Sequence, residues 1–477
     1  MSKTSKGFAW SAIDYFSVQA IQFIISIIIA RLVSPSAYGV IVMVQVFMGF
    51  AQIFIESGFK DALIQKKDRR DIDFYTVFIF NIVVAVALYV LIFIASPLIA
   101  DFYNEPMLIP LTRVIALNLI ISSISIIQLV RLQINLDFKT QAKARIISVI
   151  LSGIIGIVCA YNGMEVWALV IQGILSSFIT TVMLMFFSRW YPRLQFSVES
   201  FKCLFAYGSK MLFGNFLTTC YIQITNLIIG KVYTPAQLAY YNRAFSISQL
   251  PSASLTGIIS RTTFPILCQL QDDEEKLMDS YKKYVRLSCL IIFPILAFVC
   301  VFAKPLIMVV LTERWVEMAP LLSIFCMVFV PYPIFVICNQ VVLAKGYAGL
   351  MTQAVVVKRT IGFPLLVITL PISVMAVALG LVVGNIMEML ISMYCLQKVS
   401  EQSICQQLSM FWDIVLITVL ASLVAWLCSS FFDIHIIKLI VAFAINCISY
   451  ILCIYFFRLK ERFVINKIIE KTIKNNE

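Results

Sequence analysis

The chain has 477 residues, of which 61% are apolar and only 13% are charged, and its formal net charge is +12. Charged residues make up about a quarter of an average soluble domain, so this composition excludes the soluble globular classes. We therefore expect an all-α polytopic membrane protein.

Fourteen apolar runs follow one another along the chain, each close to the roughly 20 residues that a membrane-spanning helix needs. The first run holds Asp14, Gln19 and Gln22, and it is too long and too polar for the core of a cleavable signal. Only Pro371 separates the eleventh run from the twelfth. The expected spans are residues 8–30, 38–56, 74–100, 107–130, 142–161, 166–187, 205–230, 238–267, 284–303, 319–344, 351–370, 372–396, 411–431 and 434–457.

One passage occurs twice, 200 residues apart, because residues 28–35 (IIARLVSP) return as 228–235 (IIGKVYTP). In each copy an apolar run ends in a basic residue, Ser or Thr plus Pro makes a turn, and a second apolar run begins. This pattern predicts a duplicated helical hairpin. Internal duplication in a membrane protein is typical of transporters built from two lobes around a central site.

The duplication and the apolar runs together predict the domain organisation. We expect an N-terminal lobe at residues 1–187, a cytoplasmic linker at 188–204 and a C-terminal lobe at 205–398. Two further helices follow at 399–457, and residues 458–477 form an amphipathic basic tail on the inner leaflet.

Lysine and arginine residues gather in alternate loops, as the positive-inside rule requires if both termini are cytoplasmic. The net charge is thereby explained by membrane topology, so we expect no nucleic-acid partner. Basic residues in the cytoplasmic parts of the runs, Arg145 among them, are counted here with the adjoining cytoplasmic loops. On that count five basic residues fall in the opposite loops (Arg31, Lys231, Lys304, Arg314 and Lys438), and three fall within the runs (Arg113, Lys210 and Arg243).

The thirteen cysteines are scattered through the apolar runs without a CxxC pair, and His435 is the single histidine. We interpret the cysteines as small core residues and expect neither disulfides, nor a metal site, nor a cofactor.

Several short motifs, in order along the chain, resemble bacterial polysaccharide flippases. These are the Wzx-type members of the multidrug/oligosaccharidyl-lipid/polysaccharide (MOP) exporter superfamily. The motifs are residues 58–65 (GFKDALIQ), 99–103 (IADFY), 166–170 (VWALV), 240–244 (YYNRA) with 250–251 (LP), and 314–315 (RW) with 319–322 (APLL). The glycine usual before the Trp motif is replaced here around Thr312 and Glu313, which leaves the geometry of that loop open.

The resemblance implies two six-helix lobes forming a V, with two extra C-terminal helices. It also implies alternating access that moves an undecaprenyl-pyrophosphate-linked oligosaccharide from the inner to the outer leaflet of the bacterial inner membrane. The glycan would serve O-antigen, capsule or exopolysaccharide synthesis. Polysaccharide-assembly proteins would be further partners, and coupling to Na⁺ or H⁺ stays open.

Charged residues inside spans usually face a partner or a water-filled cavity, because a charge is costly at the membrane centre. We single out five of them, Asp14, Glu56, Arg113, Lys210 and Arg243. The alternative is that they lie near enough to helix ends to reach the headgroups.

An arginine suits the implied pyrophosphate because its fork of donors binds phosphate oxygens in pairs. Amide side chains exchange hydrogen bonds with sugar hydroxyls without fixing one sugar. Ordinary interhelical hydrogen bonding would explain the amides as well. The candidate substrate-binding residues are Arg243, Lys210, Asp14, Gln19, Gln22, Asn215, Gln223, Asn226 and Gln249.

At the offset of 200, Asp61 corresponds to Arg261, so the repeats place opposite charges at equivalent helix ends. We expect this pair, with Lys60, to form an inner gate. The alternative is that Lys60 and Arg261 only anchor the topology.

Two other function classes remain to be weighed. A membrane-embedded polymerase or glycosyltransferase would need a long outer loop carrying acid, base or metal-binding residues, and the outer loops here are short. We therefore expect no enzyme. A multidrug or organic-cation exporter would want acidic cavity residues, which Asp14, Glu56 and Glu388 could supply. The sign of the charge that lines the cavity separates these readings.

Overall fold

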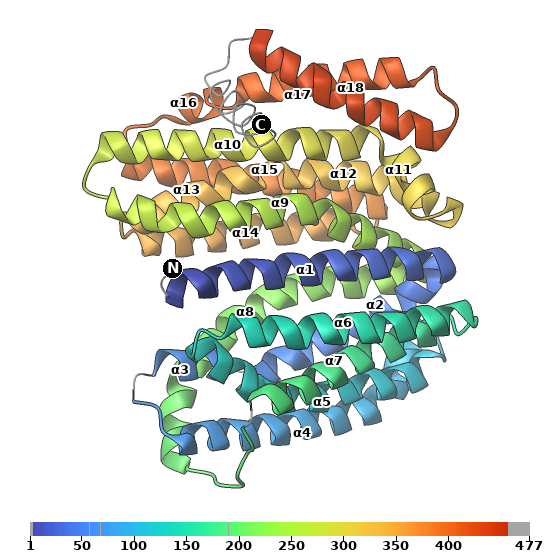
Figure 1. Cartoon of the computed structure of the whole chain (residues 1–477), viewed down its shortest axis with the longest axis vertical. Coiled ribbons are helices and arrows are strands. Elements are labelled where there is room, and N and C mark those ends of the chain that lie inside the picture. Colours follow the sequence, from blue (N-terminus) through green and yellow to red (C-terminus); the bar gives the residue numbers. More distant parts are fainter. Residues whose placement is uncertain (1–2, 57, 67, 189, 457–477) are drawn as a thin grey trace, which may run out of the picture. The chain divides into compact units, whose positions relative to one another are not determined.

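The computed structural model describes residues 3–56, 58–66, 68–188 and 190–456, which form helices and no strand (Figure 1). Each of the fourteen predicted spans falls on a helix, and the tenth is divided in two. The helices are α1 (Lys3–Leu32), α2 (Pro35–Glu56), α3 (Phe59–Gln65), α4 (Asp71–Tyr103), α5 (Leu108–Ile134), α6 (Phe138–Tyr161), α7 (Val166–Ser188), α8 (Val198–Val232), α9 (Pro235–Gln269), α10 (Glu274–Val301), α11 (Ala303–Val310), η1 (Glu313–Met318), α12 (Ala319–Phe329), α13 (Tyr332–Ala344), α14 (Ala348–Thr369), α15 (Val374–Val399), α16 (Ile404–Ser409), α17 (Trp412–Ser429) and α18 (His435–Phe456).

Among the described residues, eleven helical segments are long and apolar enough to cross a membrane. Helix α9 is long enough but too polar, and the apolar parts found in α1 and α8, Ser17–Leu32 and Ile222–Val232, are shorter than a span. The chain is thus an all-α, multi-pass membrane protein. The basic tail predicted at residues 458–477 lies outside the described residues.

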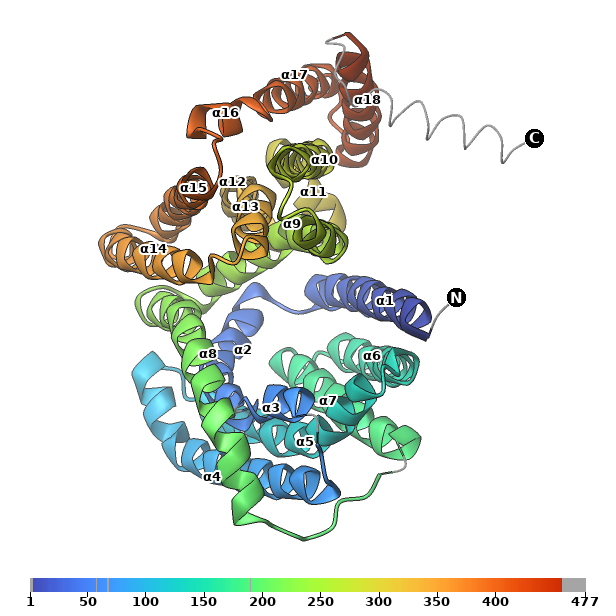
Figure 2. The same cartoon turned by 90° about the vertical axis from the view of Figure 1, so that its left-hand side faces the viewer.

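The contacts divide the chain into two compact units, residues 1–239 and 240–477. In the first unit α8 packs against α2, α3 and α4, and α1 packs against α6 (Figure 2). In the second unit α15 packs against α12, α13 and α14. The lobe boundaries expected from the sequence stay a prediction.

The duplicated hairpin is confirmed by matching hydrogen bonds at its two turns. The Ser34 hydroxyl accepts a bond from the Ala37 N–H at 3.4 Å, and the Thr234 hydroxyl accepts one from the Gln237 N–H at 3.3 Å. Each bond satisfies a backbone donor that the first turn of a helix otherwise leaves open. The sequence repeat therefore preserves the way in which α2 and α9 begin.

The turns of the two hairpins lie against each other within the first unit. A β-carbon added to Gly39 would stand 1.7 Å from the carbonyl oxygen of Pro235. Only a residue without a side chain fits at that distance. Gly39 in the first copy is thus required by the second copy of the same hairpin.

One proline divides a predicted span, and several others lie within helices. Helix α12 ends at Phe329 and α13 begins at Tyr332, with Pro331 between them. Proline has no backbone N–H, so the helical hydrogen-bond ladder stops there. Other prolines lie inside unbroken helices, namely Pro97, Pro251, Pro265, Pro294 and Pro364.

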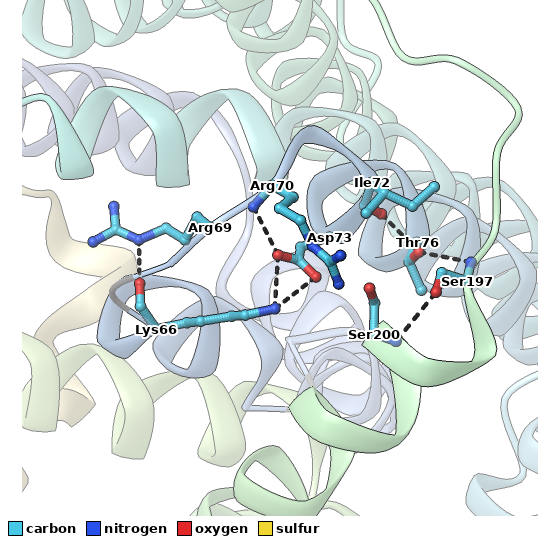
Figure 3. A network of polar contacts seen from close by, with 8 residues as sticks. All are labelled: Lys66, Arg69, Arg70, Ile72, Asp73, Thr76, Ser197 and Ser200. Carbon is cyan, nitrogen blue, oxygen red and sulfur yellow. Dashed lines mark hydrogen bonds and ion pairs between the residues drawn. The ribbon is translucent and has the colours of Figure 1, made fainter.

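The predicted linker packs on the start of α4 (Figure 3). Trp190 is buried and stacks on Tyr75, with ring centroids 5.7 Å apart. The backbone N–H of Ser197 donates to the Thr76 hydroxyl at 3.0 Å. Beside them Lys66 forms an ion pair of 2.8 Å with Asp73, whose side chain is fully buried. The linker is therefore part of the first unit's packing.

Candidate functional site

A polar pocket opens between three helices of the first unit, with a volume of about 300 Å³. Gln19 and Gln22 reach it from α1, Arg145 from α6, and Ser176 and Thr180 from α7. Its remaining lining is apolar, from Val18 and Val149. The structure therefore brings two predicted amides together with an arginine and two hydroxyls.

Arg145 is the charged lining residue that the sequence analysis missed, and the hydroxyls of Ser176 and Thr180 were not predicted either. Arg145 lies within the predicted span 142–161, but Lys139 and Lys143 precede it, so it was taken as part of a basic loop. In the structure it is half-buried in the second turn of α6, whereas Lys143 is exposed. Its place inside an apolar run was the available signal.

Arg145 is also the one charged residue among the described residues that line this pocket. A guanidinium presents five donors and no acceptor, while amides and hydroxyls both donate and accept. The pocket can therefore hold an anionic group beside a polyhydroxyl group. Asp14 lies one turn before Val18 on α1, and its side chain is outside the described set.

The predicted amides of α8 do not line this pocket. A β-carbon added to Gly49 of α2 would stand 2.2 Å from the Gln223 amide nitrogen, so Gln223 lies closely against α2. Asn226 is half-buried one turn further along α8. The side chains of Lys210 and Asn215 are not among those described, and their roles stay predictions.

Arg243 and Gln249 lie on α9, and the structure shows what surrounds them. Arg243 is half-buried and Gln249 is exposed. Next to Arg243, Tyr240 packs edge-on against the buried Trp315, with ring centroids 5.9 Å apart, and its hydroxyl donates to the Arg314 carbonyl at 3.0 Å. The motif around Arg243 thus fixes α9 to the 3₁₀ helix η1, which settles the geometry of the Trp loop.

The expected gate residues are only partly described. Lys60 is half-buried on α3, and Arg261 is exposed on α9. The Asp61 side chain lies outside the described set, so its pairing with Arg261 stays a prediction. Two other charged residues of the spans have local partners: Arg113 donates to the Ser96 hydroxyl at 2.9 Å, and Glu56 accepts from Gln52 at 3.2 Å.

A second charged feature lies inside the helices of the second unit. Lys358 of α14 forms an ion pair with Glu388 of α15. The sequence analysis placed only Arg113, Lys210 and Arg243 among the basic residues within spans, so it missed Lys358. Among the described residues no group of three or more His, Cys, Asp or Glu side chains could hold a metal ion.

Comparison with known families decides the identity. The family model described as polysaccharide biosynthesis protein matches residues 28–320, more than half of the chain. The chain belongs to this family.

Two relatives extend the match over most of the chain. The teichuronic acid biosynthesis protein TuaB of Bacillus subtilis (strain 168) is 25% identical over 354 residues, covering 72% of each chain. The lipopolysaccharide biosynthesis protein WzxC of Escherichia coli (strain K12) is 24% identical over 396 residues, covering 82% of this chain and 79% of that one.

Solved structures share the fold. The lipid II flippase MurJ in an inward closed conformation superposes with a TM-score of 0.76 and 16% identity, covering 95% of this chain and 99% of that one. An inward-facing multidrug resistance MATE family transporter of the MOP superfamily gives a TM-score of 0.62 and 15% identity, covering 81% and 98%. The predicted resemblance to the MOP superfamily is thereby confirmed at the level of the fold.

Proposed function

We propose that this member of the polysaccharide biosynthesis protein family is a flippase of the bacterial inner membrane. It moves an undecaprenyl-pyrophosphate-linked oligosaccharide from the cytoplasmic to the outer leaflet by alternating access, with both termini in the cytoplasm. Support comes from relatives named for teichuronic acid and lipopolysaccharide biosynthesis and from one named a succinoglycan biosynthesis transport protein. The MurJ fold gives independent support.

The observation that carries the proposal is the charge of the pocket between α1, α6 and α7. Arg145 supplies a positive charge, and none of the described residues that line the pocket is acidic. A basic lining attracts a lipid pyrophosphate and repels an organic cation. The sign of the charge thus favours a flippase over the drug exporter that the same fold also supports.

Each lining group has a chemical task in this proposal. Arg145 binds phosphate oxygens through paired N–H donors. Gln19, Gln22 and the two hydroxyls exchange hydrogen bonds with sugar hydroxyls, which suits glycans of varied sequence. Outward movement of a negative headgroup is favoured by about 2.3 kcal/mol per charge for each 100 mV of inside-negative potential.

The test is export in a deletion strain that carries the gene on a plasmid. Arg145→Ala is expected to lower the rate of surface glycan appearance by about 10- to 100-fold, because one charge-assisted hydrogen bond contributes about 1.5–3 kcal/mol. The lipid-linked glycan should accumulate on the inner leaflet, where mass spectrometry of extracted lipids identifies it. Arg145→Lys should keep part of the activity.

Lys143→Ala is the matched control, since Lys143 is an exposed basic residue on the same helix. It should export normally. Normal export by Arg145→Ala at equal protein levels would remove the pocket from the proposal. Ethidium resistance that depends on the gene, without glycan accumulation in its absence, would favour the drug exporter.

A further inference from the structure

The Lys358–Glu388 ion pair joins two helices near their middles. Lys358 lies at the middle of the 22-residue α14, and Glu388 lies near the middle of the 26-residue α15. At 1.5 Å per residue, each is about 15 Å or more from the nearest end of its helix. Four other ion pairs, Lys66–Asp73, Arg131–Asp71, Lys276–Asp273 and Lys345–Glu274, lie at or near the ends of helices or in loops. In a fifth, Arg286–Asp413, only Arg286 is well inside its helix.

The Lys358–Glu388 pair also has fewer additional hydrogen bonds than the Lys66–Asp73 and Lys345–Glu274 pairs. Asp73 accepts from the Arg70 N–H at 2.9 Å in addition to Lys66, and Lys345, which pairs with Glu274, also donates to the Val399 carbonyl at 2.8 Å.

For Lys358 and Glu388, the described residues provide only the bond between the two side chains. An ammonium has three donors, so Lys358 keeps donors for a second anion. Its other near contact is the ring of Phe335, whose centroid lies 5.7 Å from the Lys358 nitrogen.

The pair is not sealed in the core of its unit. The Lys358 side chain is 29% exposed and that of Glu388 is 15% exposed. A charge facing lipid chains at the middle of a span is costly, and such charges face protein or water instead. We therefore expect the exposed part of this pair to face water, from which a soluble headgroup can reach it.

From these observations we infer that Lys358 is a phosphate-binding residue and that Glu388 is its resident counter-ion. This rests on the flippase function proposed above and names a second site for the phosphate groups of the same substrate. A lipid phosphate takes the place of the Glu388 carboxylate on Lys358, because both present anionic oxygens to one ammonium. When the headgroup moves on, Glu388 pairs with Lys358 again.

The exchange explains why an acidic residue stands beside the phosphate site. A lone lysine halfway across the membrane would hold the headgroup too firmly, and transport needs binding that is weak enough to release. Glu388 competes with the lipid phosphate for Lys358 and so lowers the affinity of the site for the headgroup. It also neutralises Lys358 whenever the substrate is absent.

Binding to the full-length protein in lipid nanodiscs tests the exchange. The probes are undecaprenyl pyrophosphate, undecaprenol as the phosphate-free control, and inorganic pyrophosphate to separate the headgroup from the lipid. Glu388→Gln is expected to tighten undecaprenyl pyrophosphate binding by about tenfold, since it removes the competing charge. Lys358→Ala weakens binding, and in the double variant Glu388→Gln gives no gain. Binding of undecaprenol stays the same throughout.

Glu274→Gln is the matched control, because it removes the acidic partner of Lys345 near the helix ends and should leave the affinity unchanged. If Glu388→Gln is folded but binds the pyrophosphate no tighter than the unsubstituted protein, the pair is a structural brace and the exchange is wrong.

If the unsubstituted protein binds undecaprenyl pyrophosphate no better than undecaprenol, the proposed flippase function fails, and the exchange fails with it. Should Glu388→Gln not fold, Glu388→Asp shortens the carboxylate and carries the same expectation at a smaller factor. Weaker binding by that variant would overturn the exchange.

Discussion

Helix α6 of the first unit packs on α7, helix α14 of the second packs on α15, and the turns that lead into α6 and α14 have the same geometry. Before α6 the Asp137 N–H donates to the Leu132 carbonyl at 2.9 Å, and before α14 the Tyr347 N–H donates to the Val342 carbonyl at 3.1 Å. The residue preceding each donor, Leu136 or Gly346, has a positive φ, of 55° and 85° respectively. The backbone of the turn is thus common to the two repeats.

The polar side-chain contact between α6 and α7 differs in kind from the one between α14 and α15. In the first unit the buried Ser148 hydroxyl donates to the Ser176 carbonyl, which joins α6 to α7 without charge. In the second unit Lys358 and Glu388 join α14 to α15 as ions. Backbone turns are fixed by local hydrogen bonds, whereas a contact between helices needs only two complementary groups. The duplicated architecture therefore leaves the polar chemistry of each repeat free to diverge.

The largest effect of such divergence is expected at the start of the third long helix of each repeat. At α4 the pair is buried, with 22% of the Lys66 side chain and none of Asp73 exposed. At α10 the pair is open, with 73% of Lys276 and 42% of Asp273 exposed. Asp73→Asn should lower the free energy of unfolding by about 3–5 kcal/mol, because it leaves Lys66 half-buried without its counter-charge.

Asp273→Asn is the matched control and should hardly change stability, since water screens an exposed pair and asparagine also caps a helix. Unfolding in SDS can be followed by tryptophan fluorescence, to which the buried Trp190 beside Tyr75 contributes. Equal losses at the two sites would contradict the contrast between the repeats.

The difference between local turns and contacts between helices also explains which features could be predicted from the sequence. The turns at Pro35 and Pro235 were predictable because a repeated sequence makes repeated local bonds. Arg145 was missed because a charged residue near the start of a span looks like the end of a loop. Whether Lys358 is tolerated inside a span depends on Glu388, which lies 30 residues further along the chain and beside it only after folding. Such pairing has no signature in local hydropathy.

A smaller loss of stability is expected where the two copies of the hairpin differ at Gly39. At the offset of 200, Gly39 of α2 corresponds to Ala239 of α9, and both are buried. Gly39→Ala should destabilise the first unit by about 1–3 kcal/mol, because its β-carbon would overlap the Pro235 carbonyl. The thermal unfolding midpoint in detergent is the measurement.

Gly173→Ala is the control for this change, as nothing besides the nearby backbone of its own helix lies within 4 Å of where its β-carbon would stand. It should be neutral or slightly stabilising because alanine favours the helix. A Gly39→Ala protein as stable as the parent would show that the two hairpin turns can separate without cost.

The smallest effect on stability is expected at the uncharged hydrogen bond between α6 and α7 of the first repeat. Ser148→Ala removes the bond to the Ser176 carbonyl, and interhelical hydrogen bonds of this kind contribute about 0.6 kcal/mol in membrane proteins. Ser152→Ala is the control, because the Ser152 hydroxyl is buried but bonds only to Val149 of its own helix. SDS unfolding should separate the two variants slightly, and glycan export should be normal in both. Loss of export in Ser148→Ala at normal protein levels would mean that the α6–α7 contact takes part in transport. The uncharged Ser148–Ser176 contact of the first repeat would then have a role in transport, as we propose for the Lys358–Glu388 pair of the second.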